Sequence, residues 1–155
     1  KIAVMWRNAL AGSRDLYSAI STDRGRTFAP ARKLGSATWT LNACPMDGGA
    51  IAWTGQPEPE AVWRRDTTIY LGRADRPEAK LAANAMQPLI VSTPAGRNML
   101  WENDGNLVLQ LASTDPAPFA KKARAASLIS LPDGRLAIAW ESSLTGAPRL
   151  LFAVP

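Results

Sequence analysis

Short runs of apolar residues, separated by glycine and proline, make up most of this chain. Twelve prolines and eleven glycines interrupt runs whose length suits β-strands. Signals for helices are nearly absent along the whole sequence. This pattern is typical of a protein built from β-strands and turns, so we expect an all-β fold.

The strand-like runs repeat, and each repeat contains a tryptophan. Similar apolar runs end near Trp6, Trp53, Trp101 and Trp140, which are 47, 48 and 39 residues apart. A glycine turn precedes each of the last three, at Asp47-Gly48, Ala95-Gly96 and Asp133-Gly134. Such turns join antiparallel strands, because glycine accepts the positive φ that they require.

A second run follows each tryptophan after a segment of variable length. These runs are Leu16–Ile20, Thr68–Leu71, Leu107–Leu111 and Arg149–Phe152, and a further short run closes the unit at Ala31–Leu34 and Lys80–Ala82. Four strands in a period of about 40–50 residues predict the blade of a β-propeller. A tandem β-sandwich is the alternative, but it would not repeat its turn residues so regularly.

Counting strands in this way gives about three and a half blades, each four-stranded and antiparallel when complete. Residues 1–35 form an incomplete blade, 38–83 and 86–124 form complete blades, and 125–155 form a blade that lacks its last strand. An open arc of blades would expose apolar sheet faces, which soluble proteins rarely tolerate. We therefore expect a partner that completes the ring, either an N-terminal half of the same propeller or a second chain.

The segment from Ser21 to Phe28 (Ser-Thr-Asp-Arg-Gly-Arg-Thr-Phe) lies between two predicted strands of one blade. Ser21 and Asp23 can accept hydrogen bonds from the N–H groups of the turn, and Gly25 can adopt a backbone conformation closed to other residues. Thr27 begins the next strand, and Phe28 can fold its ring over the turn into the blade. The segment resembles the Asp box, Ser-x-Asp-x-Gly-x-Thr-Phe, of the bacterial neuraminidase repeat or sialidase-like family.

Other segments are similar to bacterial members of that family, among them Trp6-Arg-Asn8, Arg14-Asp-Leu-Tyr17 and residues 41–49. The resemblance implies a propeller of six blades when complete, in an exported protein (periplasmic or extracellular). It also implies that the Asp box is structural and lies on the face opposite the active site. The functional face would then carry residues 7–15, 54–66, 102–105 and 141–147, together with the blade connections at 36–40 and 83–87.

Sialidases of this family clamp a substrate carboxylate with three arginines, whose planar guanidinium groups pair with it bidentately. They use a tyrosine nucleophile polarised by a glutamate, with an aspartate as acid and base. Charged residues beside strand ends on the expected functional face are therefore candidate catalytic residues: Arg7, Arg14, Glu102 and Glu141. Candidate binding residues are Asn8, Trp39, Trp63, Arg64 and Asp104.

Composition removes several classes of function. The net charge is +5, but the 18 lysines and arginines are scattered, so we expect no nucleic-acid partner. No apolar run approaches the roughly 18 residues that span a bilayer. The chain has no histidine, which excludes a histidine base or triad within it. Cys44 is the single cysteine and is expected to be a small buried hydrophobe, and we expect no metal or cofactor.

Two functions remain open. The first is a non-catalytic binding or scaffold module of the Asp-box propeller type, with a ligand such as a carbohydrate, or a protein partner, on the loop face opposite the Asp box. The alternative is a glycoside hydrolase of the exo-α-sialidase type. The only tyrosines, Tyr17 and Tyr70, fall inside predicted strands, which favours the first function. A tyrosine–glutamate pair facing three arginines would favour the second.

Overall fold

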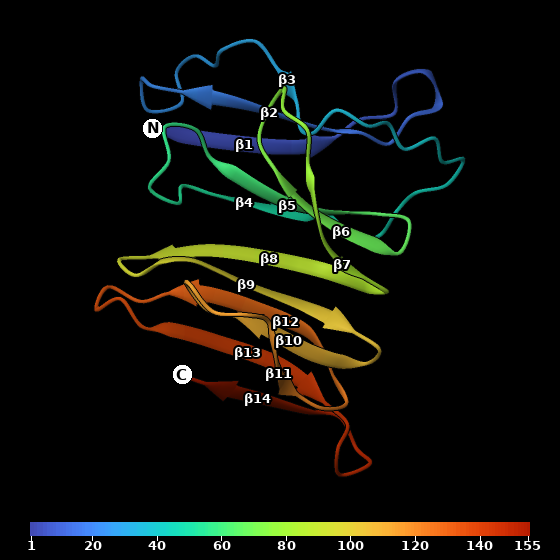
Figure 1. The fold of residues 1–155 in the computed structure, drawn as a ribbon, viewed down its shortest axis with the longest axis vertical. Helices are drawn as coiled ribbons and strands as arrows, with labels where there is room; N and C mark the ends of the chain where they lie inside the picture. Colours follow the sequence, from blue (N-terminus) through green and yellow to red (C-terminus); the bar gives the residue numbers. More distant parts are fainter.

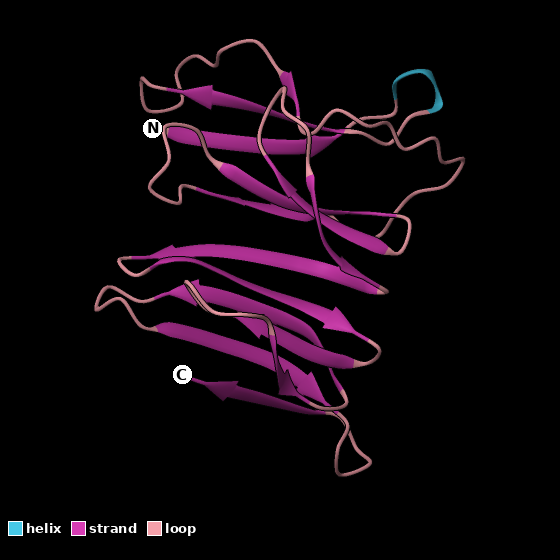
Figure 2. Ribbon diagram, viewed as in Figure 1, coloured by secondary structure: helices cyan, strands magenta, loops and turns pink.

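The computed structural model describes residues 1–155 and consists of β-strands with one three-residue 3-10 turn, Leu10–Gly12 (Figure 2). Because this turn is the only helical element, the structure has no helix that could cross a membrane. The expected all-β fold is confirmed. The strands form four antiparallel sheets of three or four strands each.

The four sheets follow one another in chain order, and within each sheet the strands lie in sequence order. Sheet I contains β1 (Ile2–Arg7), β2 (Leu16–Ser21) and β3 (Arg32–Lys33), and sheet II contains β4 (Gly49–Ala52), β5 (Glu60–Arg65), β6 (Thr68–Gly72) and β7 (Ala79–Ala83). Sheet III contains β8 (Ala85–Thr93), β9 (Gly96–Asn103), β10 (Asn106–Gln110) and β11 (Ala117–Ala120). Sheet IV contains β12 (Ala123–Ser130), β13 (Leu136–Ser142) and β14 (Arg149–Ala153). Figure 1 shows the sheets arranged along the long axis, from sheet I beside the N-terminus to sheet IV beside the C-terminus.

One tryptophan occupies the same place in every sheet, namely Trp6 on β1, Trp63 on β5, Trp101 on β9 and Trp140 on β13. The register sets Trp6 opposite Tyr17 and Trp63 opposite Tyr70. In both pairs the ring centroids are 6.4 Å apart and the rings are inclined by 26°. The prediction that Trp53 is the equivalent of Trp6 is therefore wrong, because Trp53 follows the end of β4, the first strand of sheet II.

The second strand of sheet II lies where the sequence predicted a connection on the functional face. Residues 54–66 contain prolines and glutamates, yet Glu60–Arg65 pairs with both β4 and β6. Trp63 is only 4% exposed, so it packs inside the protein. Residues 54–59 lie instead at the end of the sheets that carries the turn of residues 21–28. There Glu58 forms an ion pair with Arg32 at 2.6 Å. The strand forms because both faces of this segment are covered by neighbouring sheets, and tertiary packing overrides the local loop signal.

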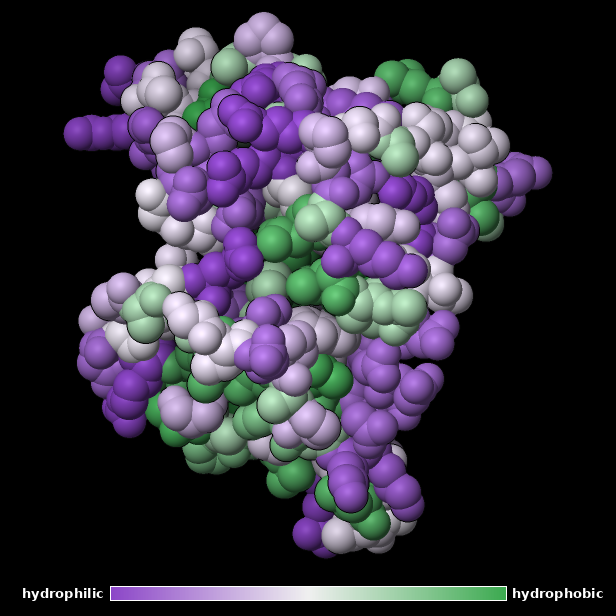
Figure 3. All heavy atoms as spheres, in the orientation of Figure 1, coloured by the Kyte–Doolittle hydropathy of each residue, from purple (hydrophilic) through white to green (hydrophobic).

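Neighbouring sheets bury each other's apolar faces, and each interface places a tryptophan of the later sheet in one cluster with side chains of the earlier sheet. These groupings are Trp63 with Leu16, Trp101 with Val62 and Ile69, and Trp140 with Leu100 and Leu107. Val62, Ile69 and Leu100 are fully buried, and burial of such a side chain contributes about 1.5–3 kcal/mol. Apolar side chains gather between the sheets in Figure 3. The sheets thus share three interface cores.

Residues 21–28 form the turn between β2 and β3, which we call the Asp-box turn after the motif that it resembles. Its own side chains hold it in place. Ser21 Oγ donates to Asp23 Oδ1 (2.7 Å) and accepts from the Gly25 N–H (2.8 Å). The Thr27 N–H and hydroxyl donate to the two oxygens of Asp23 at 2.9 and 2.6 Å. Gly25 has φ +86°, where a side chain would be strained. Phe28 is 43% exposed, so the expectation that its ring folds into the blade is wrong.

We expect replacement of Gly49 with alanine to destabilise the fold. A Cβ at this position would lie 2.5 Å from the Val62 carbonyl oxygen, inside the β4–β5 pair. Overpacking of this kind costs about 1–3 kcal/mol, which urea denaturation followed by tryptophan fluorescence would measure. Gly48→Ala is the matched control, because a Cβ at Gly48 meets no atom within 4 Å. Equal losses in the two variants would contradict this packing.

A second prediction concerns Asp23. Hydrogen bonds, first that from the Thr27 hydroxyl, lower the pKa of Asp23 from 3.8 to about 2. Since the folded pKa lies below the ordinary value, the carboxylate stabilises the fold above pH 3.8, and this stabilisation is lost as the pH falls toward 2. Asp23→Asn should lower Tm at pH 7, and its difference from wild type should shrink across that window. A difference that is constant with pH would argue against an ionised Asp23 in the turn.

Candidate functional site

The residue that follows the repeated tryptophan lies at or next to the end of its strand in every sheet (β1, β5, β9 and β13), and it is charged in all four: Arg7, Arg64, Glu102 and Glu141. These strand ends lie opposite the Asp-box turn, because β1, β9 and β13 run away from the end at which β2 leads into that turn (Figure 1). The sign of the charge at this position differs between the two halves of the molecule. Sheets I and II place arginines at this position, and sheets III and IV place glutamates.

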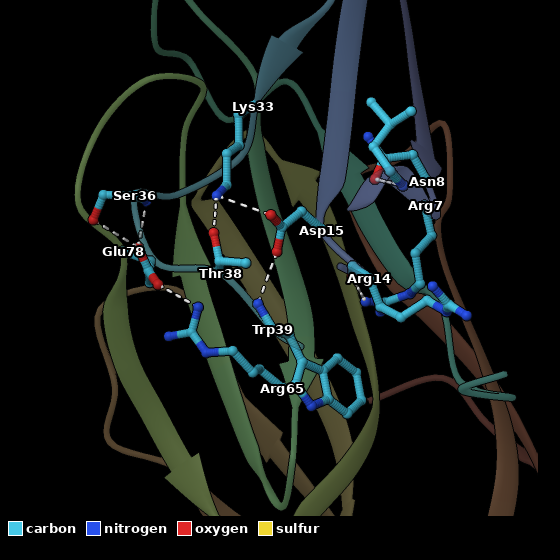
Figure 4. A network of polar contacts seen from close by, with 11 residues as sticks. Arg7, Asn8, Arg14, Asp15, Lys33, Ser36, Thr38, Trp39, Arg65 and Glu78 are labelled. Carbon is cyan, nitrogen blue, oxygen red and sulfur yellow. Dashed lines mark hydrogen bonds and ion pairs between the residues drawn. The ribbon is translucent and has the colours of Figure 1, made fainter. Parts of the chain in front are cut away.

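Arg7 and Arg14 lie together over the connection between sheets I and II (Figure 4). Arg7 Nη1 donates to the Arg14 carbonyl oxygen, and the Arg7 guanidinium lies 5.3 Å from the centre of the Trp39 ring. Arg14 donates from Nε to the Ala43 carbonyl oxygen at 2.9 Å and from Nη1 to its neighbour Ser13 at 3.0 Å. Both arginines therefore hold the loops of this region through backbone carbonyls.

The Trp39 indole is 7% exposed and forms the floor of this site. Its backbone N–H donates to Asp15 Oδ1 at 2.9 Å, and Asp15 Oδ2 pairs with Lys33 at 2.9 Å. Burial alone would raise the pKa of Asp15, but the bonds from Trp39 and Lys33 outweigh it and hold that pKa below its ordinary value. Asp15 therefore carries a negative charge that fixes the floor.

Three carboxylates near the site each pair with a cation of their own. Asp15 pairs with Lys33, Asp47 with Arg64 at 2.6 Å and Glu78 with Arg65 at 2.7 Å. Arg7 and Arg14 have no carboxylate within salt-bridge distance. Partial burial lowers the pKa of Arg7; Asp47 opposes this shift and Arg64 adds to it. The site thus holds two positive charges without an acidic partner.

Asp47 joins the connection before sheet II to sheet III. Its Oδ2 accepts from the Gln87 N–H at 3.0 Å, and Gln87 has φ +51° in a β-bulge of β8. Arg64 Nε lies 2.6 Å from the same oxygen, but its N–H is not aligned as a hydrogen bond, so we treat the contact as an ion pair. Asp47 is 4% exposed, and its Oδ1 has no partner. This carboxylate is a residue that the sequence reasoning missed.

Glu102 has the same role one sheet further on. Its Oε1 accepts from the Ala125 N–H at 2.7 Å, and Ala125 has φ +49° in a β-bulge of β12. Each bulge exposes an N–H that the strand ladder cannot satisfy, and a carboxylate from the preceding part of the chain accepts it. Glu102 is therefore used in joining sheet III to sheet IV.

The candidate residues from the sequence divide into two groups. The structure brings together Arg7, Arg14, Trp39 and Arg64, with Trp63 in the wall beneath them. Asn8 follows Arg7 and accepts a bond from the Leu10 N–H. Glu102, Asp104 and Glu141 belong to sheets III and IV, and Glu141 pairs at the surface with Arg124 at 2.6 Å.

The hollow between the arginines is narrow, with room for about one water molecule. It is a charged surface site, and a ligand would bind across it rather than inside it. Tyr17 and Tyr70 lie within strands, stacked on Trp6 and Trp63, and neither lines the hollow, although the Tyr70 ring lies 4.2 Å from the Arg65 guanidinium at its rim. Cys44 is exposed in the connection between sheets I and II, so the prediction of a buried cysteine is wrong. The structure contains no group of three acidic or cysteine side chains that could hold a metal ion.

Comparison of the chain with models of protein families gave no match, and comparisons with curated proteins and with solved structures gave none either.

We expect Asp47→Ala to be strongly destabilising, because it leaves Arg64 without its counter-charge and the Gln87 N–H without its acceptor. Removing one partner of a buried pair costs about 3–5 kcal/mol, and the loss here should fall at the lower end because the Arg64 side chain is 22% exposed. Urea denaturation would measure it. Glu141→Ala is the control, since the exposed Arg124–Glu141 pair should contribute little. Similar midpoints for the two variants would contradict the joining role of Asp47.

Proposed function

We propose that this chain is a non-catalytic binding module of the β-propeller type, and that it binds an anionic ligand at Arg7 and Arg14. The four sheets, their repeated tryptophan and the Asp-box turn support the propeller architecture, with each sheet as a blade. The resemblance to Asp-box proteins supports an exported bacterial protein and directs the choice of ligand to an acidic carbohydrate.

The observation that carries this proposal is the pair of arginines without acidic partners. A guanidinium has five N–H donors, and Arg7 and Arg14 each use two of them on backbone carbonyls. The remaining donors can pair with a carboxylate in the bidentate geometry that arginine favours. Arg64 and Arg65 add positive potential at the rim, although each already has its own carboxylate.

The binding surface is fixed before a ligand arrives. Trp39 is buried beneath Arg7, and Asp15 and Lys33 hold the backbone of Trp39 in place. A side chain that is already ordered loses little conformational entropy on binding. An arginine pair held in this way favours a compact anionic ligand over a flexible, uncharged ligand.

A glycoside hydrolase of the sialidase type is the second candidate, and the gathering of Arg7, Arg14 and Arg64 favours it. Three arginines on one surface are what a substrate carboxylate requires in that class. A binding module is preferred because the tyrosines of this chain lie in tryptophan stacks and Glu102 is used between sheets.

Binding of N-acetylneuraminic acid, as a carboxylate-bearing probe, tests the proposal by isothermal titration calorimetry at pH 7. Arg7→Ala and Arg14→Ala should each weaken binding at least tenfold, about 1.4 kcal/mol. Arg7→Lys should fall between Arg7→Ala and wild type, because lysine keeps the charge but loses the planar fork. Binding should also weaken as salt rises.

Arg26→Ala is the matched control, because Arg26 is an exposed arginine in the Asp-box turn on the opposite face. The methyl ester of the probe, which lacks the negative charge, should bind at least tenfold more weakly than the acid. Equal binding of acid and ester would refute the anion site. Release of a fluorophore from a sialoside, abolished by Glu102→Gln or Glu141→Gln, would favour the hydrolase instead.

A further inference from the structure

The four sheets present two kinds of face. One face carries the repeated tryptophan, and we call it the Trp face. The other carries the residue before the tryptophan, together with the residue of the following strand that pairs with the position after the tryptophan. We call it the receiving face. Its members are Met5 and Leu16 in sheet I, Val62 and Ile69 in sheet II, Leu100 and Leu107 in sheet III, and Ala139 and Leu150 in sheet IV.

Three interfaces inside the molecule repeat one contact. Trp63 packs in the cluster that contains Leu16 of sheet I, and Trp101 packs in the cluster that contains Ile69 of sheet II. Trp140 likewise packs in the cluster that contains Leu107 of sheet III. In every case the Trp face of one sheet covers the receiving face of the sheet before it. The three buried tryptophans are 3% to 9% exposed.

One face of each kind is left uncovered at the two ends of the molecule. Trp6 is 40% exposed at the Trp face of sheet I, with Ile2 and Val4 beside it on the same side of β1. Leu150 and Phe152 are 80% and 81% exposed at the receiving face of sheet IV. Ile69 and Leu107, the equivalents of Leu150, are 0% exposed, and Leu109, the equivalent of Phe152 in sheet III, is 8% exposed. Sheet IV thus carries large apolar side chains, exposed here, at positions that are buried in sheets II and III.

We infer that the Trp face of sheet I docks on the receiving face of sheet IV of a second copy of this chain. The reason is continuity with three interfaces in which the same pair of surfaces already meets. The contact joins two different surfaces, so it is heterologous, head to tail, and it can close into a ring. Two copies of four sheets give eight sheets, which lies within the range of about four to eight blades seen in propellers.

Size-exclusion chromatography with light scattering tests this directly. The wild-type chain should have twice its monomer mass of 16.6 kDa, and the double variant Leu150→Lys/Phe152→Lys should have the monomer mass. Val4→Lys, on the other face, should also be monomeric, and Trp6→Ala provides a second variant there. Met46→Lys changes an 89% exposed residue outside both faces and should remain dimeric. Far-UV circular dichroism confirms that each variant is folded.

Mixing the variants distinguishes this head-to-tail contact from a contact in which a face packs against the same face of the second copy. A copy with Val4→Lys keeps an intact receiving face, and the Leu150→Lys/Phe152→Lys copy keeps an intact Trp face. Each alone should be monomeric, whereas an equimolar mixture should form a dimer through one intact joint. A wild-type chain that stays monomeric at about ten times the concentration used for the variants would overturn the inference. So would variants that remain dimeric, or a mixture that does not associate.

Discussion

The contact between a tryptophan and the receiving face of the preceding sheet is the interaction on which the rest of this structure depends. Each sheet has only three or four strands and could not bury its apolar faces alone. Sheets II and III are covered on both sides, and Val62, Ile69, Leu100 and Leu107 are consequently fully buried. Because this contact repeats, the orientation of each sheet follows from that of its neighbour. The charged residue after each tryptophan is thereby brought to one end of the molecule.

The same end of the molecule carries the polar joints between sheets. A β-bulge near the start of β8 and another in β12 free an N–H, and Asp47 and Glu102 accept these bonds. A carboxylate is therefore needed for packing wherever one sheet meets the bulged first strand of the next. This requirement explains why Glu102 is a poor candidate for catalysis. It also explains why Arg64 is paired with Asp47, whereas Arg7, which has no carboxylate within salt-bridge distance, forms no ion pair.

Much of the fold followed from the sequence because strands and turns carry local signals. Runs such as Leu16–Ile20 and Thr68–Leu71 became β2 and β6, since short, largely apolar runs bounded by turn residues are typical of buried strands. The Trp53 alignment failed because Ile51-Ala-Trp53 resembles Val4-Met-Trp6 locally, while the true equivalent, Trp63, follows prolines that resemble a loop. Only the pairing of β5 with two strands distinguishes them, and that pairing is non-local.

The site was only partly predictable for a related reason. Arg7 and Arg14 were candidates because they stand beside predicted strand ends, and Trp39 and Arg64 because they fall in predicted connections of the functional face; the fold brings the four together. Asp15, Asp47 and Lys33 were not candidates, because a charged side chain that is paired inside the fold has no sequence pattern of its own. The adjacent Gly48-Gly49 was a usable signal, since Gly49 is where the backbone of β4 closes on Val62.

The arrangement of charge separates the anion site from the open ends. Glu102 reaches from sheet III to the strand that begins sheet IV, so the position after each tryptophan points toward the following sheet. Arg7 has this position in sheet I and lies beside Trp39 and Arg64, between sheets I and II. Glu141 has it in sheet IV and is paired only with Arg124 at the surface. In a head-to-tail contact Glu141 would meet the Trp face of sheet I, whereas Arg7 lies on the opposite, receiving face of that sheet. Ring closure would therefore leave the anion site uncovered, because the two interactions use different faces of sheet I.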